Sequence, residues 1–218
     1  MFIGHFGVGF AAKRLAPRAS LGTLFLAAQL VDLLWPTFLL VGWERVAISP
    51  GITAVTPLDF EHYPITHSLA GAATWGVLLG LAYYAVTDRK REAAWVALLV
   101  VSHWGLDALV HRPDLPLSPF GPERIGLGLW DSMSLTIAVE SIFFVGGLWL
   151  YARGTRAVDG VGRWSLFGLV AFLVIIQALN LAGGPPPSVQ AIAWAGHAQW
   201  LLVIWAYWVD RHRAIVSP

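Results

Sequence analysis

Long apolar segments alternate with short polar ones along almost the whole chain. Six of the apolar segments hold about 20 residues each, the length that a helix needs to cross the hydrocarbon core of a bilayer. They cover residues 20–42, 67–87, 93–111, 132–152, 164–183 and 190–209. Charged residues, Gly and Pro lie between them, as is typical of connecting loops. The pattern therefore predicts an all-α, polytopic membrane bundle with about six spans.

A further apolar segment, residues 2–12, is too short to be a span. A helix over this segment would be only ~16 Å long, about half the hydrocarbon thickness. One interpretation is a half-helix that starts at mid-depth, is buried in protein and ends at Lys13 and Arg14. It would place His5 near the bilayer midplane. The other interpretation is an amphipathic helix lying on the cytoplasmic surface.

Composition supports a single membrane domain over residues 1–218 and limits its chemistry. Hydrophobic residues make up 57% of the chain and charged residues only 12%, whereas a soluble domain has roughly 25% charged residues. The chain has no cysteine, which excludes disulfides, thiolate zinc sites, iron–sulfur clusters and cysteine nucleophiles. A metal would need imidazole and carboxylate ligands. A net charge of +1 without a basic stripe gives no indication of nucleic-acid binding.

The basic residues predict the orientation of the chain. Of the 14 lysines and arginines, three (Arg45, Arg112 and Arg124) fall on one side of the predicted spans. The other eleven fall on the opposite side: Lys13, Arg14, Arg18, Arg89, Lys90, Arg91, Arg153, Arg156, Arg163, Arg211 and Arg213. Because cytoplasmic loops are enriched in Lys and Arg, both termini are predicted to be cytoplasmic.

Five ionisable residues interrupt the predicted spans: Asp32, His67, His103, Asp107 and Glu140. A charged side chain at membrane depth costs about 2.5–3.5 kcal/mol on insertion scales and usually marks a functional site. The predicted orientation places most of these residues in the outer half of the membrane, with Asp32 and His103 nearer mid-depth. Their similar depth and their residue types suggest a buried metal centre.

The series His103, Asp107 and His111 is the strongest local signal, because residues four apart lie on one face of a helix. Four residues rise ~6 Å along a helix, so His103 and Asp107 can share an ion. His111 lies ~12 Å from His103 along the axis, and would bind a second metal or line an entrance. The alternative is a polar stripe that is hydrogen-bonded to a neighbouring helix. Asp32 could likewise be a neutral, hydrogen-bonded structural carboxyl group.

Several short motifs together resemble a known family. They are His5, Asp32, the Thr66-His67-Ser68 sequence, the His103 and Asp107 pair, and Leu129-Trp130-Asp131-Ser132 followed by Glu140. This set resembles the LexA-binding, YdjM-like family of metal-dependent hydrolases of the bacterial inner membrane. That family is distantly similar to zinc-dependent phospholipase C and to the single-strand-specific nucleases. The resemblance covers residues 1–145, and residues 146–218 add two further spans.

The resemblance implies a function and a ligand set. It implies one or two divalent ions, zinc by preference, held by His5, Asp32, His67, His103 and Asp107, and the four-residue spacing adds His111 as a further candidate ligand. Glu140 and Asp107 would act in catalysis, although Thr136 stands where the soluble relatives have a histidine, so a three-metal set is not expected. A site in the outer half of the bilayer suits a lipid-linked ester or phosphoester.

Two other functions are compatible with the sequence. A haem-binding electron carrier would use His103 with His67 or His197, although the neighbouring carboxylates suit a harder cation. A non-catalytic subunit of a larger membrane complex would use the polar residues only to join helices, and its 12 tryptophans would anchor it at the interfaces and pack against partner proteins.

Overall fold

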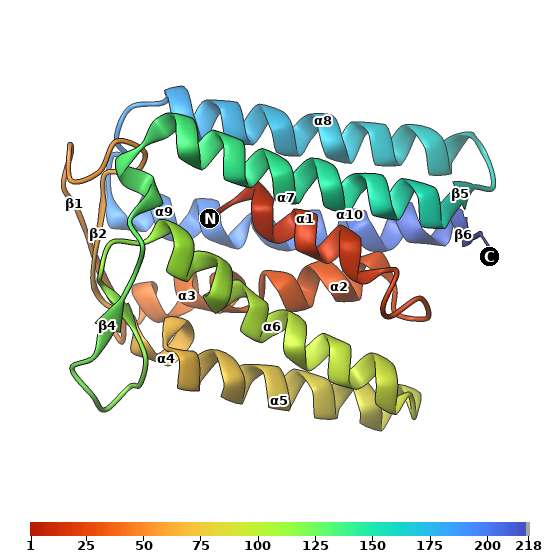
Figure 1. Cartoon of the computed structure of the whole chain (residues 1–218), viewed down its shortest axis with the longest axis horizontal. Coiled ribbons are helices and arrows are strands. Elements are labelled where there is room, and N and C mark those ends of the chain that lie inside the picture. The colour runs from red at the N-terminus through yellow and green to blue at the C-terminus, as the bar shows by residue number, and fades with distance from the viewer. Residues whose placement is uncertain (217–218) are drawn as a thin grey trace.

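Helices run along the length of the molecule, and short strands lie at their ends (Figure 1). The computed structural model describes residues 1–216. The helices are α1 (Ile3–Ala12), α2 (Leu21–Ala28), α3 (Leu30–Leu40), α4 (Pro64–His67), α5 (Leu69–Thr87), α6 (Lys90–Val110), η1 (Leu129–Asp131), α7 (Met133–Gly154), α8 (Gly160–Ala182), α9 (Val189–His197) and α10 (Gln199–Arg211). The strands are β1 (Arg45–Ile48), β2 (Leu58–His62), β3 (Leu115–Pro116), β4 (Arg124–Ile125), β5 (Thr155–Ala157) and β6 (Arg213–Ile215).

Four helices, α5 to α8, are each long and apolar enough to cross a membrane. The bent pair of α2 and α3 could provide a fifth crossing. These helices agree with the prediction of a membrane protein. The predicted span over residues 190–209 corresponds to α9 and α10, which have 9 and 13 residues. Each is shorter than the ~20 residues of a full crossing.

The prediction of an exclusively helical chain needs a correction, because three small antiparallel sheets are present. The pairs β1–β2 and β3–β4 lie in the loops over residues 43–63 and 111–128, and β5 pairs with β6 at the opposite end of the bundle. These strands have two to five residues. Such short ladders satisfy loop backbone groups without a hydrophobic alternation that would have revealed them in the sequence.

Helix α1 is enclosed by the bundle. Most of its residues are buried, and it packs chiefly against α7 and also against α2 (Figure 1). At Gly7 and Gly147 the backbones of α1 and α7 approach so closely that a Cβ atom on either glycine would overlap the other helix. Small residues commonly permit such contacts between helices. This burial favours the half-helix interpretation over a helix lying on a surface.

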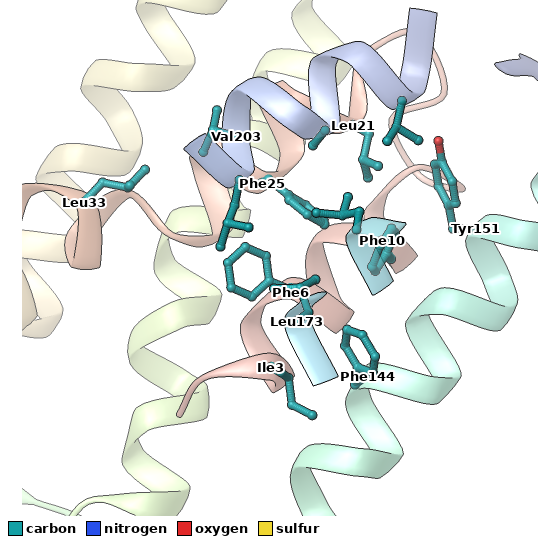
Figure 2. Close-up of a cluster of buried hydrophobic side chains, with 14 residues drawn as sticks. Ile3, Phe6, Phe10, Leu21, Phe25, Leu33, Phe144, Tyr151, Leu173 and Val203 are labelled. Atoms are coloured by element: carbon teal, nitrogen blue, oxygen red, sulfur yellow. The ribbon is translucent and has the colours of Figure 1, made fainter. Parts of the chain in front are cut away.

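Aromatic side chains form the core around α1. Figure 2 shows Phe6 and Phe10 of α1 directed toward Phe25 of α2, with Phe144 and Tyr151 of α7 on another side. Phe25 meets both phenylalanines of α1 edge to face, at ring-centroid distances of 4.9 Å. Edge-to-face packing of this kind is favourable beyond the area that it buries. The core thus fixes α1, and with it the position of His5.

The end of the bundle that carries β5 and β6 is rich in basic residues. Lys13 is buried and binds Asp210 at 2.7 Å, and Tyr151 donates to the other oxygen of Asp210 at 3.1 Å. Arg89 donates to the carbonyl of Arg18 at this same end. The fold therefore gathers the basic segments that the sequence places on one side of the spans.

Candidate metal centre

A cluster of histidines and aspartates lies where α1, α3, α4 and α6 meet. His5 belongs to α1, Asp32 to α3, His67 to α4, and His103 and Asp107 to α6. Two groups of potential ligand atoms each lie within 4.8 Å of one another: His5, His103 and Asp107 form the first, and Asp32, His67 and His103 the second. We call these five residues the His/Asp cluster. The structure thus brings together five of the six residues proposed as metal ligands.

Asp107 is at the centre of the cluster and is 2% exposed. Its Oδ1 lies 3.1 Å from Nε2 of His5, and its Oδ2 lies 3.1 Å from Nε2 of His103 and 4.0 Å from Nε2 of His67. The carboxylate therefore presents Oδ1 to His5 and Oδ2 to His103 and His67. This arrangement suits a carboxylate that bridges two cations.

His103 is held in an orientation that leaves Nε2 for a ligand. Its Nδ1 lies 2.7 Å from the carbonyl oxygen of Ala28, so it donates its proton there. Ala28 is the last residue of α2, directly before the 53° bend to α3. Nε2 lies 3.6 Å from Oδ2 of Asp32 and, among residues 1–216, has no hydrogen-bond partner of good geometry. The rings of His103 and His5 stack at 3.6 Å.

His67 is oriented by a chain of two further residues. Its Nδ1 lies 2.7 Å from Oγ1 of Thr66, and the Thr66 hydroxyl donates to Oε2 of Glu44 at 2.7 Å. Because the Thr66 hydroxyl donates to Glu44, Nδ1 of His67 donates to Thr66, and Nε2 of His67 lies on the side of the cluster, 3.2 Å from Oδ1 of Asp32. Metal-binding histidines are typically supported in this way.

Glu44 was missed as a part of this site in the sequence. It is 1% exposed and also accepts from the backbone N–H groups of Ile65 and Thr66. Glu44 therefore fixes the first turn of α4 as well as Thr66. It lies more than 20 residues from both, in a loop, so helical spacing gives no signal for it.

The amino group of Met1 is a second feature that the sequence did not indicate. It is buried and lies 2.8 Å from Oδ1 of Asp107. Helix α1 begins at the cluster, so the chain segment before it reaches the same carboxylate oxygen as His5. The amino group donates to the Asp107 carboxylate on that side of the cluster.

Glu140 lies beside the cluster but belongs to neither group of potential ligands. Its Oε2 accepts from the backbone N–H groups of Phe2 and Gly4 at 2.9 and 3.2 Å. A carboxylate in this position satisfies free N–H groups at the start of α1 and interacts favourably with the helix dipole. Its proposed catalytic role remains a prediction.

His111 is also outside the two groups of potential ligands. Its Nδ1 lies 2.9 Å from Oδ1 of Asp114, and the hydroxyl of Tyr63 is within 3.3 Å. Of the two roles predicted for it, the structure shows a position in a cavity wall.

Thr136 donates to the carbonyl of Leu129 and ties η1 to α7. His197 is bound through both ring nitrogens, to Thr37 and to the Ala193 carbonyl.

The cluster opens into a cavity of about 1000 Å³. Asp32, His67, Asp107, His111 and Glu140 lie in its wall. Ligand pockets of enzymes commonly have volumes of ~300–1,000 Å³. The cavity is therefore large enough to bring a substrate into contact with the cluster.

The donor set fits a divalent metal ion. Two buried or partly buried carboxylates face three imidazoles, and imidazole with carboxylate suits zinc, manganese and iron. An Nε2 atom without a hydrogen-bond partner on His103 and the supported tautomer of His67 both leave nitrogen lone pairs directed into the cluster. Comparison of the chain with protein-family models, curated proteins and solved structures finds no match.

Proposed function

We propose that this chain is a membrane-embedded, metal-dependent hydrolase that acts on a lipid-linked ester or phosphoester. The observation that carries the proposal is the His/Asp cluster, buried among apolar helices and open to a cavity of about 1000 Å³. Buried ionisable residues among membrane helices usually mark a functional site. The resemblance to the YdjM-like hydrolases supports the same chemistry.

The residues suggest one or two ions, with zinc as the first candidate. Asp32, His67, His103 and Oδ2 of Asp107 would hold one, and His5 with Oδ1 of Asp107 would hold the other. A bound zinc-type ion supplies a water molecule whose pKa is lowered to ~7. The carboxylate of Asp107 would position both ligand groups, and Thr66 with Glu44 would keep His67 in its acceptor tautomer.

Glu140 is the residue that we propose to hold the proton of the attacking water. It lies in the cavity wall next to the cluster, and its Oε2 is fixed by two backbone N–H groups. Hydrolysis adds the elements of water across the ester bond, so one proton must pass from the nucleophile to the leaving group. A carboxylate that faces the cavity can carry that proton.

The carboxylates favour a metal ion over haem as the occupant. Asp32 lies within 3.6 Å of Nε2 of both His67 and His103, and oxygen ligands suit a harder cation than haem iron. The alternative pairing with His197 is not favoured, because both nitrogens of that ring are hydrogen-bonded elsewhere.

We also propose six crossings of the bacterial inner membrane, with both termini in the cytoplasm. Helices α2 and α3 would form one crossing and α9 and α10 another, and the basic end of the bundle would face the cytoplasm. The His/Asp cluster would then lie in the outer half of the bilayer. Reporter fusions after residues 55, 90, 120, 158 and 186 should alternate outside, inside, outside, inside, outside. A cytoplasmic signal at residue 120 would contradict this topology.

The hydrolase assignment is tested with the protein in lipid nanodiscs. Loading with zinc or manganese should give hydrolysis of phospholipids or acyl-ester lipids, and a chelator should remove it reversibly. The double variant H103A/D107A should be inactive, whereas H197N, outside the cluster, should keep its activity. A metal-loaded wild type that leaves every ester and phosphoester lipid intact would overturn the assignment.

A further inference from the structure

The cavity wall contains polar side chains that do not belong to the His/Asp cluster. Gln177 and Asn180 of α8 and Gln199 of α10 contribute amide groups, and His111 contributes its ring at the end of α6. Apart from histidines, the ionisable side chains in the wall are all carboxylates, and no lysine or arginine of residues 1–216 lines the cavity. The amides and His111 therefore bear on what occupies the cavity besides a metal ion.

Gln177 is a buried amide in a helix that is long and apolar enough to cross a membrane. It is 7% exposed and continues the buried stripe of α8 that contains Leu169 and Leu173. Its side chain makes no hydrogen bond within the described residues, yet neither amide atom is enclosed, in contrast to both amide atoms of Gln29. Buried polar groups are nearly always hydrogen-bonded in folded proteins. The amide of Gln177 is thus open to an occupant of the cavity.

His111 is a second buried side chain with an open polar atom, and it is 2% exposed. Its Nδ1 donates to Oδ1 of Asp114 at 2.9 Å, and the Tyr63 hydroxyl donates to the same oxygen at 3.1 Å. The ring also packs against Trp130 and Phe60, at centroid distances of 4.3 and 4.8 Å. These contacts fix the ring. Its Nε2 has no hydrogen-bond partner in residues 1–216 and is not enclosed, so it is available in the cavity wall.

Both open groups are suited to hydroxyl groups. An amide accepts through its oxygen and donates through its nitrogen, and Nε2 of an imidazole accepts when the ring is neutral and donates when it is protonated. A hydroxyl group donates and accepts, so it can pair with each of these atoms. A phosphate only accepts and an ammonium group only donates, so each would leave part of the Gln177 amide unpaired. The wall also offers an anionic headgroup no lysine or arginine.

We propose that the cavity binds a lipid headgroup that is neutral and carries several hydroxyl groups, as a hexose does, with Gln177 and His111 as its hydrogen-bond partners. The inference rests on the proposed function, which supplies the lipid-linked ester, and it narrows the substrate class to neutral glycolipids. His111 then sets the specificity for the substrate and does not bind a second metal ion.

The test uses the metal-free protein in phosphatidylcholine nanodiscs, so that it does not depend on hydrolysis. A hexosyl diacylglycerol with a diazirine on the sugar is photolysed, and the labelled residues are mapped by mass spectrometry. We expect labels on Gln177 and Leu202, which line the cavity and are only 7% and 6% exposed. Unlabelled hexosyl diacylglycerol should suppress these labels at about 10-fold lower concentrations than diacylglycerol or phosphatidylethanolamine, which lack the additional hydroxyl groups.

Matched variants test the two hydrogen-bonding side chains. Q177L should lower labelling of Leu202 by about 10-fold, whereas Q190L makes the same change on α9 outside the cavity lining and should leave it unchanged. H111F keeps an aromatic ring against Trp130 and should also lower labelling. Because Q177L removes a buried amide without a partner, the empty variant should melt at a higher temperature than the wild type.

Two results would overturn the inference. One is equal suppression of the labels by all three unlabelled lipids. The other is wild-type labelling in both Q177L and H111F, which would mean that these side chains serve only the fold.

The failure of this inference is distinguishable from the failure of the proposed function. Metal-dependent hydrolysis of lipid esters without a preference for the glycolipid would leave the hydrolase and remove the headgroup site. Glycolipid labelling in a protein that binds no metal would leave the headgroup site and remove the hydrolase.

Discussion

Residues 1–145 and residues 146–218 contribute differently to the same cavity. The first part supplies every member of the His/Asp cluster, in which His5 of α1 meets His103 and Asp107 of α6. The second part supplies apolar side chains from α8, α9 and α10 on the opposite wall. Ligands require fixed geometry, and hydrogen bonds to the Ala28 carbonyl and the Thr66 hydroxyl hold the rings of His103 and His67.

Loss of the Asp107 carboxylate, at the centre of the cluster, should have the largest effect on metal binding. D107N keeps the shape of the side chain but removes the charge that faces both histidine groups. Zinc affinity should fall by more than ~100-fold, beyond the ~10–100-fold typical of residues that only orient a ligand. Isothermal titration of the metal-free protein measures this. D59N, at the same end but outside the cluster, should bind zinc normally.

Adding a methyl group at the contact between α1 and α7 should destabilise residues 1–145 by overpacking. G147A places a Cβ atom in the backbone of α1 at Gly7. Overpacking of this kind costs about 1–3 kcal/mol, so the melting temperature should fall and His5 should be displaced from the cluster. G146A is the matched control, since nothing lies within 4 Å of its added Cβ. Equal melting temperatures would show that α1 does not depend on this contact.

Removing the support of His67 should have a smaller effect. T66V abolishes the hydroxyl between His67 and Glu44. Zinc affinity should fall by ~10–100-fold with little change in fold. T74V removes a hydroxyl that donates only to a carbonyl of its own helix, and should bind zinc like the wild type. Wild-type affinity in T66V would mean that the tautomer of His67 is set by something else.

Replacing Asp159, at the start of α8, should have the smallest effect, and that effect is on stability. The backbone N–H of Gly162 and the side chain of His212 lower the pKa of Asp159 below its usual value of 3.8. The stability that this carboxylate contributes is therefore present above pH ~4 and is lost as the pH falls through the lower folded value. D159A should reduce the melting temperature slightly at pH 6 and hardly at pH 2. Zinc affinity at pH 7 should not change, because α8 carries no ligand.

The sequence predicted the cluster better than its surroundings. The four-residue spacing of His103 and Asp107 fixes one helical face, and the cost of buried charge pointed to Asp32 and His67 as their neighbours. Glu44 and Ala28 could not be found this way, because a loop carboxylate and a backbone carbonyl have no periodicity. The bend at Gln29 was also missed, since neither Gly nor Pro lies there, while Pro36 sits inside the continuous helix α3.

The central claim is that residues 1–145 hold a divalent metal ion. Elemental analysis of the purified wild-type protein, after incubation with zinc and removal of free ions, tests it most directly. The account predicts about one to two zinc ions per chain, and close to none in H103A/D107A. A folded wild-type protein without metal, or full metal content in the double variant, would contradict it.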